Sequence, residues 1–228
     1  MPTKPYSISA SQDSNAEVSK VLRNTYTLLA ATLLLSAVTA GISMAVNLSH
    51  GVGMIMSLVA IGLVWFVLPR TANSEKGLLV VFAFTALLGA SLGPILNHYL
   101  QMTNGSMLIM QALGTTAVVF FGLSGYVLTT RKDFSFMGGF LMTGLIIAVV
   151  AMLALMVAGI FGVHIAGAHL ALSGVIALVM SGFILFDTSR IINGGERNYI
   201  MATVALYLDI YNLFVSLLHI MGALGGDD

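Results

Sequence analysis

Two aspartates lie inside long apolar stretches of the chain: Asp187 in "GFILFDTS" and Asp209 in "ALYLDIYNLF". An aspartate at the centre of a membrane helix costs about 2.5–3.5 kcal/mol on insertion scales, so it is expected to face the protein interior and to pair. Two carboxylates in one site of low dielectric constant cannot both ionise cheaply. We expect them to share a proton at low pH, and at higher pH to repel or to recruit Ca²⁺, which prefers oxygen ligands. This chemistry suits a pH-dependent ion gate.

Simpler roles are open to both residues. Each aspartate could separately accept a hydrogen bond from a neighbouring helix, and Asp187 could extend toward the membrane interface or pair with Arg190 three residues later. The last apolar stretch also carries small and polar residues at helical spacing, which predicts a face turned into a bundle, with Leu and Val opposite. This polar face consists of Ala202, Ala205, Asp209, Asn212 and Ser216.

The composition indicates that the solvent of this chain is lipid. Of 228 residues, 58% are hydrophobic and 8% are charged, and the mean hydropathy is +0.98. This small number of charges cannot cover a water-facing surface. We therefore predict an integral membrane protein whose main partner is the bilayer. Lys plus Arg and Asp plus Glu number nine each, so no excess of positive charge points to nucleic acid. There is no cysteine, which excludes disulfides, thiolate nucleophiles and cysteine-bound metals.

The apolar pattern predicts an all-α fold, a bundle of seven transmembrane helices over residues 26–228. Each run is long enough to cross the hydrocarbon core, and none shows the alternation of a membrane barrel. Residues 1–25 are polar and Ser-rich, and we expect a flexible cytoplasmic tail there. The predicted spans are 26–46, 51–69, 77–100, 106–128, 134–161, 168–189 and 199–224.

The positive charges predict an orientation. All nine lie in the N-terminal tail or in the connections after predicted spans 2, 4 and 6, which alternate to one side of the membrane. The positive-inside rule places that side, with the N-terminus, in the cytoplasm and the C-terminus on the opposite, periplasmic side. The nine residues are Lys4, Lys20, Arg23, Arg70, Lys76, Arg131, Lys132, Arg190 and Arg197.

Several motifs carry a family resemblance. The stretches "FDTSRII" and "ALYLDIYNLFVSLL" resemble the Bax inhibitor (transmembrane Bax inhibitor motif) family, and "KVLRNTY", "GPILNHYL" and "YVLTTRKDFSFMGG" are similar to its bacterial YccA-like branch. The resemblance runs from about residue 20 to the C-terminus. It implies a seven-helix bundle whose last helix is central, in the bacterial inner membrane. Asp187 and Asp209 match the family's gating aspartates of a pH-sensitive calcium leak, and Arg70 is the nearest counterpart of its latch arginine.

The same resemblance implies a second role, as a substrate and modulator of the membrane protease FtsH (HflB) with its partners HflK and HflC. The tail would then be the segment, here called the grip, that the protease engages to begin degradation. We expect no enzymatic activity and no cofactor apart from Ca²⁺ as a permeant or bound ion. One alternative is an ion leak without a protease role. The other is an intramembrane aspartyl protease, which would require a Gly-x-Gly-Asp motif where this chain has Leu206-Tyr207-Leu208 before Asp209.

Overall fold

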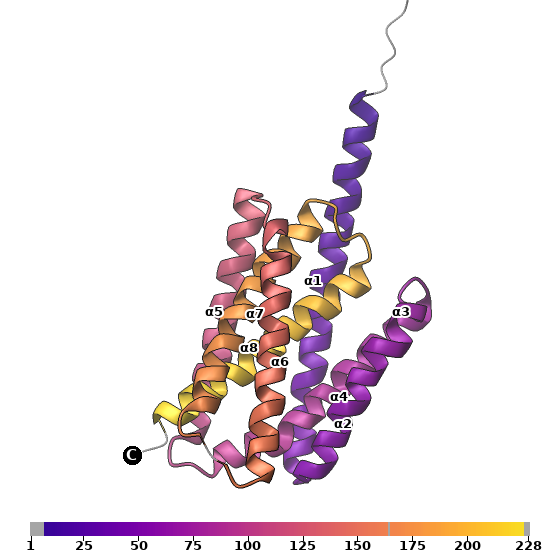
Figure 1. Cartoon of the computed structure of the whole chain (residues 1–228). Coiled ribbons are helices and arrows are strands. Elements are labelled where there is room, and N and C mark those ends of the chain that lie inside the picture. The colour runs from indigo at the N-terminus through magenta and orange to yellow at the C-terminus, as the bar shows by residue number, and fades with distance from the viewer. Residues whose placement is uncertain (1–6, 164, 226–228) are drawn as a thin grey trace, which may run out of the picture.

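The computed structural model describes residues 7–163 and 165–225, with side chains from Ala16 onward, and this part of the chain is helical without a strand (Figure 1). Three short elements interrupt or precede the long helices: a π-helical turn, the four-residue helix α3 and a 3₁₀ turn. In chain order the elements are α1 (Ser7–Ala45), α2 (His50–Gly62), η1 (Leu63–Val67), α3 (Leu68–Thr71), α4 (Glu75–Leu100), α5 (Gly105–Thr130), η2 (Ser135–Met137), α6 (Gly138–Ile160), α7 (Ala168–Ile192) and α8 (Tyr199–Gly225).

In the described part of the chain, seven helical segments are long and apolar enough to cross a membrane, which confirms the predicted count and the all-α class. The second span is composite, because α2, η1 and α3 together form one segment, His50–Thr71. The predicted ends agree within a few residues, except at the first span. The reason for the agreement is that backbone groups in lipid must be paired within their own segment, so each long apolar run becomes a helix.

Most of the predicted tail, residues 1–25, is helical in the structure. Residues 1–6 lie outside the described part of the chain, but helix α1 begins at Ser7 and runs for 39 residues, about 58 Å at 1.5 Å per residue. Its N-terminal end therefore extends beyond the rest of the bundle (Figure 1). The last part of the predicted tail belongs to the bundle itself, because Thr25 is fully buried and Val21 and Leu22 pack against the core.

Helix α8 is the centre of the bundle. It contacts α1, α4, α5 and α7, whereas α6 packs on α7 and η2 and otherwise faces outward. Accordingly 56% of the α8 span is buried inside the protein, against 11% of the α6 span. Neighbours surround α8, so apolar residues that lie away from its polar face, such as Val204 and Leu218, are buried as well.

Close packing of α1 on α4 depends on two glycines. A Cβ atom added at Gly89 would collide with Ser36 and Thr39 of α1, and one added at Gly93 would collide with Ser43. In lipid, helices gain little from apolar contact alone, so small residues that let two backbones approach are a main source of stability. This contact sets the position of α1 beside the central helix.

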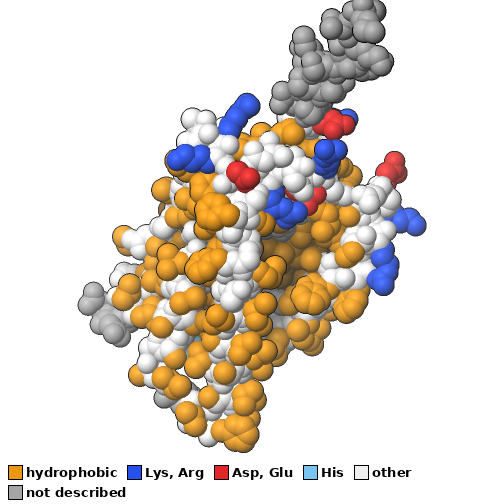
Figure 2. Space-filling model, turned by 45° about the horizontal axis from the view of Figure 1, so that its top comes forward, with side chains coloured by type: hydrophobic (Ala, Val, Ile, Leu, Met, Phe, Trp, Pro, Cys, Tyr) orange, Lys and Arg blue, Asp and Glu red, His pale blue; other side chains and the backbone are white. Residues whose placement is uncertain are grey.

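The charged side chains gather at one end of the bundle, and the rest of the surface in view is predominantly hydrophobic (Figure 2). Large exposed hydrophobic residues such as Phe140, Ile160 and Leu178 cover the sides of the helices. A surface of this kind is stable only against lipid. Among the described residues the bundle therefore has one charged end, a wide apolar belt and one end without Lys or Arg.

We predict that Gly89→Ala and the matched change Gly114→Ala have opposite effects. Gly89→Ala should lower the free energy of unfolding by about 1–3 kcal/mol, because its methyl group must displace α1. Gly114 of α5 has open space around it, so Gly114→Ala should be neutral or stabilise by up to about 1 kcal/mol through helix propensity. Thermal unfolding of both variants in detergent measures the difference, and equal midpoints would contradict the packing described.

Candidate functional site

The two aspartates of the apolar stretches meet in the interior. Asp187 lies in the last turns of α7 and Asp209 lies near the middle of α8, and their carboxyl groups are within hydrogen-bonding contact. Asp187 is 9% exposed and Asp209 is 5% exposed. The two helices are consecutive and pack along each other, which brings residues 22 positions apart in sequence into contact.

This contact is chemically demanding. A hydrogen bond between two carboxyl groups requires a proton on one of them, because two carboxylates offer only acceptors. In the described part of the chain no N–H or O–H group donates to Asp209 Oδ2, which is buried. A proton shared with Asp187, or a cation, would satisfy that oxygen, and two unprotonated carboxylates would repel each other. The arrangement can therefore exist in at least two states of charge.

Asp187 also contacts a cation on its own helix. The Arg190 Nη1 atom lies 3.7 Å from Asp187 Oδ1, and Arg190 Nη2 lies 3.4 Å from Glu196 Oε2. The Arg190 side chain is 37% exposed, so each ion pair is worth no more than about 1 kcal/mol. The spacing of three residues had indicated the first pair, whereas Glu196 was missed because its approach depends on the turn between α7 and α8. Arg190 thus links the buried pair to the charged end.

Hydroxyl groups hold the end of α7 in place. Ser124 of α5 and Thr188 share a hydrogen bond of 3.2 Å, and Ser189 Oγ accepts a 2.8 Å hydrogen bond from the Phe134 backbone N–H. Ser189 also donates to Asp133 Oδ1 at 3.4 Å. Asp133 lies in the connection between the α5 and α6 spans, where a side-chain hydrogen bond with Ser135 holds its pKa below the ordinary value. The α5–α6 connection is thereby fastened beside Asp187.

The remaining predicted site residues lie apart from this contact. Arg70 in α3 is exposed, its guanidinium donates to the carbonyl of Phe66, and α3 does not touch α7 within the described residues. The cation beside Asp187 is Arg190, so a latch role for Arg70 stays a prediction without a contact in this conformation. Asn212 donates to the Leu208 carbonyl of its own helix at 2.8 Å, and Ser216 is buried farther along α8.

The site offers few ligands for a resident metal. Among the residues that the structure describes, no three His, Cys, Asp or Glu side chains gather where they could hold a metal ion. Ca²⁺ takes six to eight oxygen ligands, and the carboxyl groups of Asp187 and Asp209 supply only part of such a shell. The pair is therefore better suited to brief contact with a partly hydrated ion than to a closed calcium site.

Comparison with known proteins adds an independent finding. Residues 18–226 match the sequence profile of the family described as "Inhibitor of apoptosis-promoting Bax1". The "Modulator of FtsH protease YccA" of Escherichia coli K12 is 51% identical over 217 residues, which cover 94% of this chain and 96% of that protein. The "Inner membrane protein YccA" of E. coli O6:H1 matches equally well. An "Uncharacterized membrane protein" of Vibrio cholerae is 51% identical over 228 residues, the full length of both chains.

Proposed function

The chain belongs to the Bax inhibitor family, and on this premise we propose that it is an inner-membrane protein that modulates an FtsH-type protease and is itself a substrate of it. The observation that carries the proposal is the identity of 51% over 94% of the chain with a relative named as a modulator of that protease. The family profile matches residues 18–226, nearly all of the seven-helix unit, so the activity is expected to come with the whole bundle. HflK and HflC, the partners expected with the protease, belong to the same proposal, and no catalytic role is assigned to the chain.

The N-terminal part of α1 is the segment best placed to be engaged by a protease. It extends past the bundle at the charged end, and among the side chains that the structure describes, none before Val21 belongs to the core (Figure 1). A protease that pulls on a membrane protein needs such a protruding segment, because the rest of the described chain is folded into helices and short turns. This supports a role for residues 2–20 as the grip.

We predict that the charged end faces the cytoplasm. The wild-type chain has no cysteine, so a single introduced cysteine is the only thiol. Asn104→Cys lies in the connection between α4 and α5 at the uncharged end, and Glu75→Cys begins α4 at the charged end, both exposed. In intact spheroplasts a membrane-impermeant maleimide should label Asn104→Cys only, and Glu75→Cys should react after permeabilisation. The reverse pattern would overturn the orientation.

Deleting residues 2–20 is expected to lengthen the lifetime of the protein several-fold in cells that contain FtsH. The physical reason is that the bundle retains Val21, Leu22 and Thr25, so it folds while the protruding grip is lost. Pulse-chase measurement of the protein follows its lifetime, and degradation of a second FtsH substrate in the same cells reports modulation.

The controls distinguish loss of the segment that FtsH engages from an effect of the deletion on folding. In cells without FtsH the full-length and shortened proteins should have equal lifetimes, and Asp209→Asn should leave co-purification with FtsH unchanged. If the shortened protein is degraded as fast as the full-length protein when FtsH is present, residues 2–20 are not the segment that the protease engages. Failure of the full-length protein to co-purify with FtsH would remove the modulator proposal altogether.

A second candidate function is supported by the contact between Asp187 and Asp209. We infer that this pair forms the gate of a pH-sensitive cation leak, with Ca²⁺ as the expected ion. The support is geometric: two buried carboxyl groups touch, one oxygen lacks a donor, and Arg190 leads from them to the charged end. Loss of the shared proton would separate the groups by repulsion and expose oxygens to a cation. The leak and the protease role are compatible, because a leak can also be a protease substrate.

Calcium flux into liposomes that contain the purified protein tests this gate between about pH 6 and pH 8. Wild-type protein should conduct in a pH-dependent manner, and Asp209→Asn should change both the flux and its dependence on pH, because an amide cannot ionise. Glu17→Gln is the matched control, since Glu17 is exposed on α1 and its loss removes one carboxylate that is not part of the pair. Flux no greater than that of empty liposomes at every pH would exclude the leak.

A further inference from the structure

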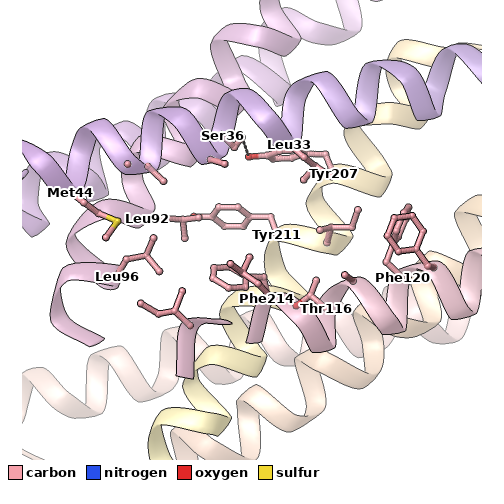
Figure 3. Close-up of a pocket in the computed structure, with 18 residues that line it drawn as sticks. Leu33, Ser36, Met44, Leu92, Leu96, Thr116, Phe120, Tyr207, Tyr211 and Phe214 are labelled. Atoms are coloured by element: carbon pink, nitrogen blue, oxygen red, sulfur yellow. Dashed lines mark hydrogen bonds between the residues drawn. The ribbon is translucent and has the colours of Figure 1, made fainter. Parts of the chain in front are cut away.

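A cavity of about 430 Å³ lies in the half of the bundle away from the charged end. Its side walls come from α1 and α5, its floor is α8, and α4 contributes Leu92 and Leu96 at one end (Figure 3). Within the described residues the backbones of α1 and α5 do not approach each other closely, although both helices pack against α8 and the rings of Tyr26 and Phe120 meet with centroids 6.1 Å apart. The cavity is therefore the space left between two helices that share a central neighbour.

The floor of the cavity is one continuous face of α8. Tyr207, Ile210, Tyr211 and Phe214 follow the i, i+3, i+4, i+7 spacing of a helix face, and all four line the cavity. Asp209 projects from a different side of the helix, toward α7. The cavity is thus distinct from the carboxyl pair and separated from it by the width of α8.

The lining is apolar and carries no charged side chain. Its two tyrosine hydroxyls already have partners: Tyr207 Oη lies 2.7 Å from Ser36 Oγ (Figure 3), and Tyr211 Oη lies 3.2 Å from Ser91 Oγ. Neither pair leaves a charge for an ion or a polar headgroup. An apolar space with satisfied hydroxyls has no hold on water, and cavities of this kind take apolar ligands.

The mouth of the cavity opens sideways, between the middle parts of two spans. The lining residues on the rim are exposed: Ala37 and Gly41 on α1, and Leu113, Ala117 and Phe121 on α5. Leu113 is eight residues from the start of α5, or about 12 Å along the helix, which is inside the hydrocarbon layer. The rim is therefore continuous with the surface that the bundle already presents to lipid.

We propose that this cavity is a binding site for one acyl chain of a membrane phospholipid, which enters between α1 and α5 and packs on the tyrosine face of α8. The proposal does not rest on the protease or the leak. Apolar side chains that line an empty space lose dispersion attraction on that side, and an acyl chain in the space restores it. A helix from another protein is too large, because a single turn occupies about 400–600 Å³ and a spanning helix has several. The headgroup stays outside, since nothing in the lining is charged.

A phospholipid with a photoreactive diazirine in its acyl chain tests the site. Full-length protein in vesicles of phosphatidylethanolamine and phosphatidylglycerol containing this lipid is irradiated, and labelled positions are mapped by peptide mass spectrometry. We expect labels at cavity-facing positions of residues 33–44, 109–121 and 207–214, including Tyr211 of the floor, at yields above those of the exposed α6 surface. Labels confined to outward-facing residues would overturn the proposal.

Two variants fill the cavity from opposite walls. Gly41 lines the cavity with nothing within 4 Å of an added Cβ, so Gly41→Leu is expected to place its side chain in the space from α1, and Ala117→Phe is expected to do so from α5. Labelling of residues 207–214 should fall to the level of α6 in both. Gly122→Leu is the matched control, since Gly122 is equally open but does not line the cavity.

The outcomes are decisive because two variants and a control are compared. Gly41→Leu or Ala117→Phe is used for the comparison only if the variant elutes as a monodisperse species in detergent. One folded variant of the two is enough for the test. Unchanged floor labelling in such a variant, or equal loss in Gly122→Leu, would overturn the site. Cross-links from a second copy of the chain into residues 207–214, in place of lipid labels, would also overturn it and assign the cavity to a protein partner.

Discussion

Keeping the carboxyl group of Asp209 out of lipid is the constraint on which the bundle depends. An aspartate at mid-membrane costs about 2.5–3.5 kcal/mol, and more if its oxygens lack partners. The chain meets this cost by surrounding α8 with α1, α4, α5 and α7, while α6 stays on the outside with an apolar surface. The close approach of α1 to α4, which Gly89 and Gly93 allow, is part of the same enclosure.

The enclosed helix presents different chemistry on its different sides. Toward α7 it offers Asp209, whose partner is Asp187, and toward the space between α1 and α5 it offers Tyr207 and Tyr211. One rigid helix thus carries an ionisable contact and an apolar cavity within two turns of each other. Because a helix transmits displacement along its length, movement of α8 at the carboxyl pair would alter the shape of the cavity floor.

The charged end is held together by polar contacts between its connecting segments. Asn198 donates to the Ala72 carbonyl at 3.0 Å and to Asn73 Oδ1 at 2.8 Å, which joins the connections after α3 and α7. Ser189 does the same for the connection after α5. If a protease pulls on the N-terminal part of α1, the force reaches these hydrogen-bonded connections. The carboxyl pair proposed as a gate lies beside the same connections, so the two proposed functions share one structural region.

The sequence by itself determined the number of spans, the all-α class, the segregation of charge and the identity of the two interior aspartates. These are local properties, since an apolar run of sufficient length must become a helix in lipid. Only the tertiary structure decided which groups meet: Arg190 lies beside both Asp187 and Glu196, and a cavity lies between helices far apart in sequence. Those contacts depend on the tilt and rotation of packed helices, which hydropathy does not encode.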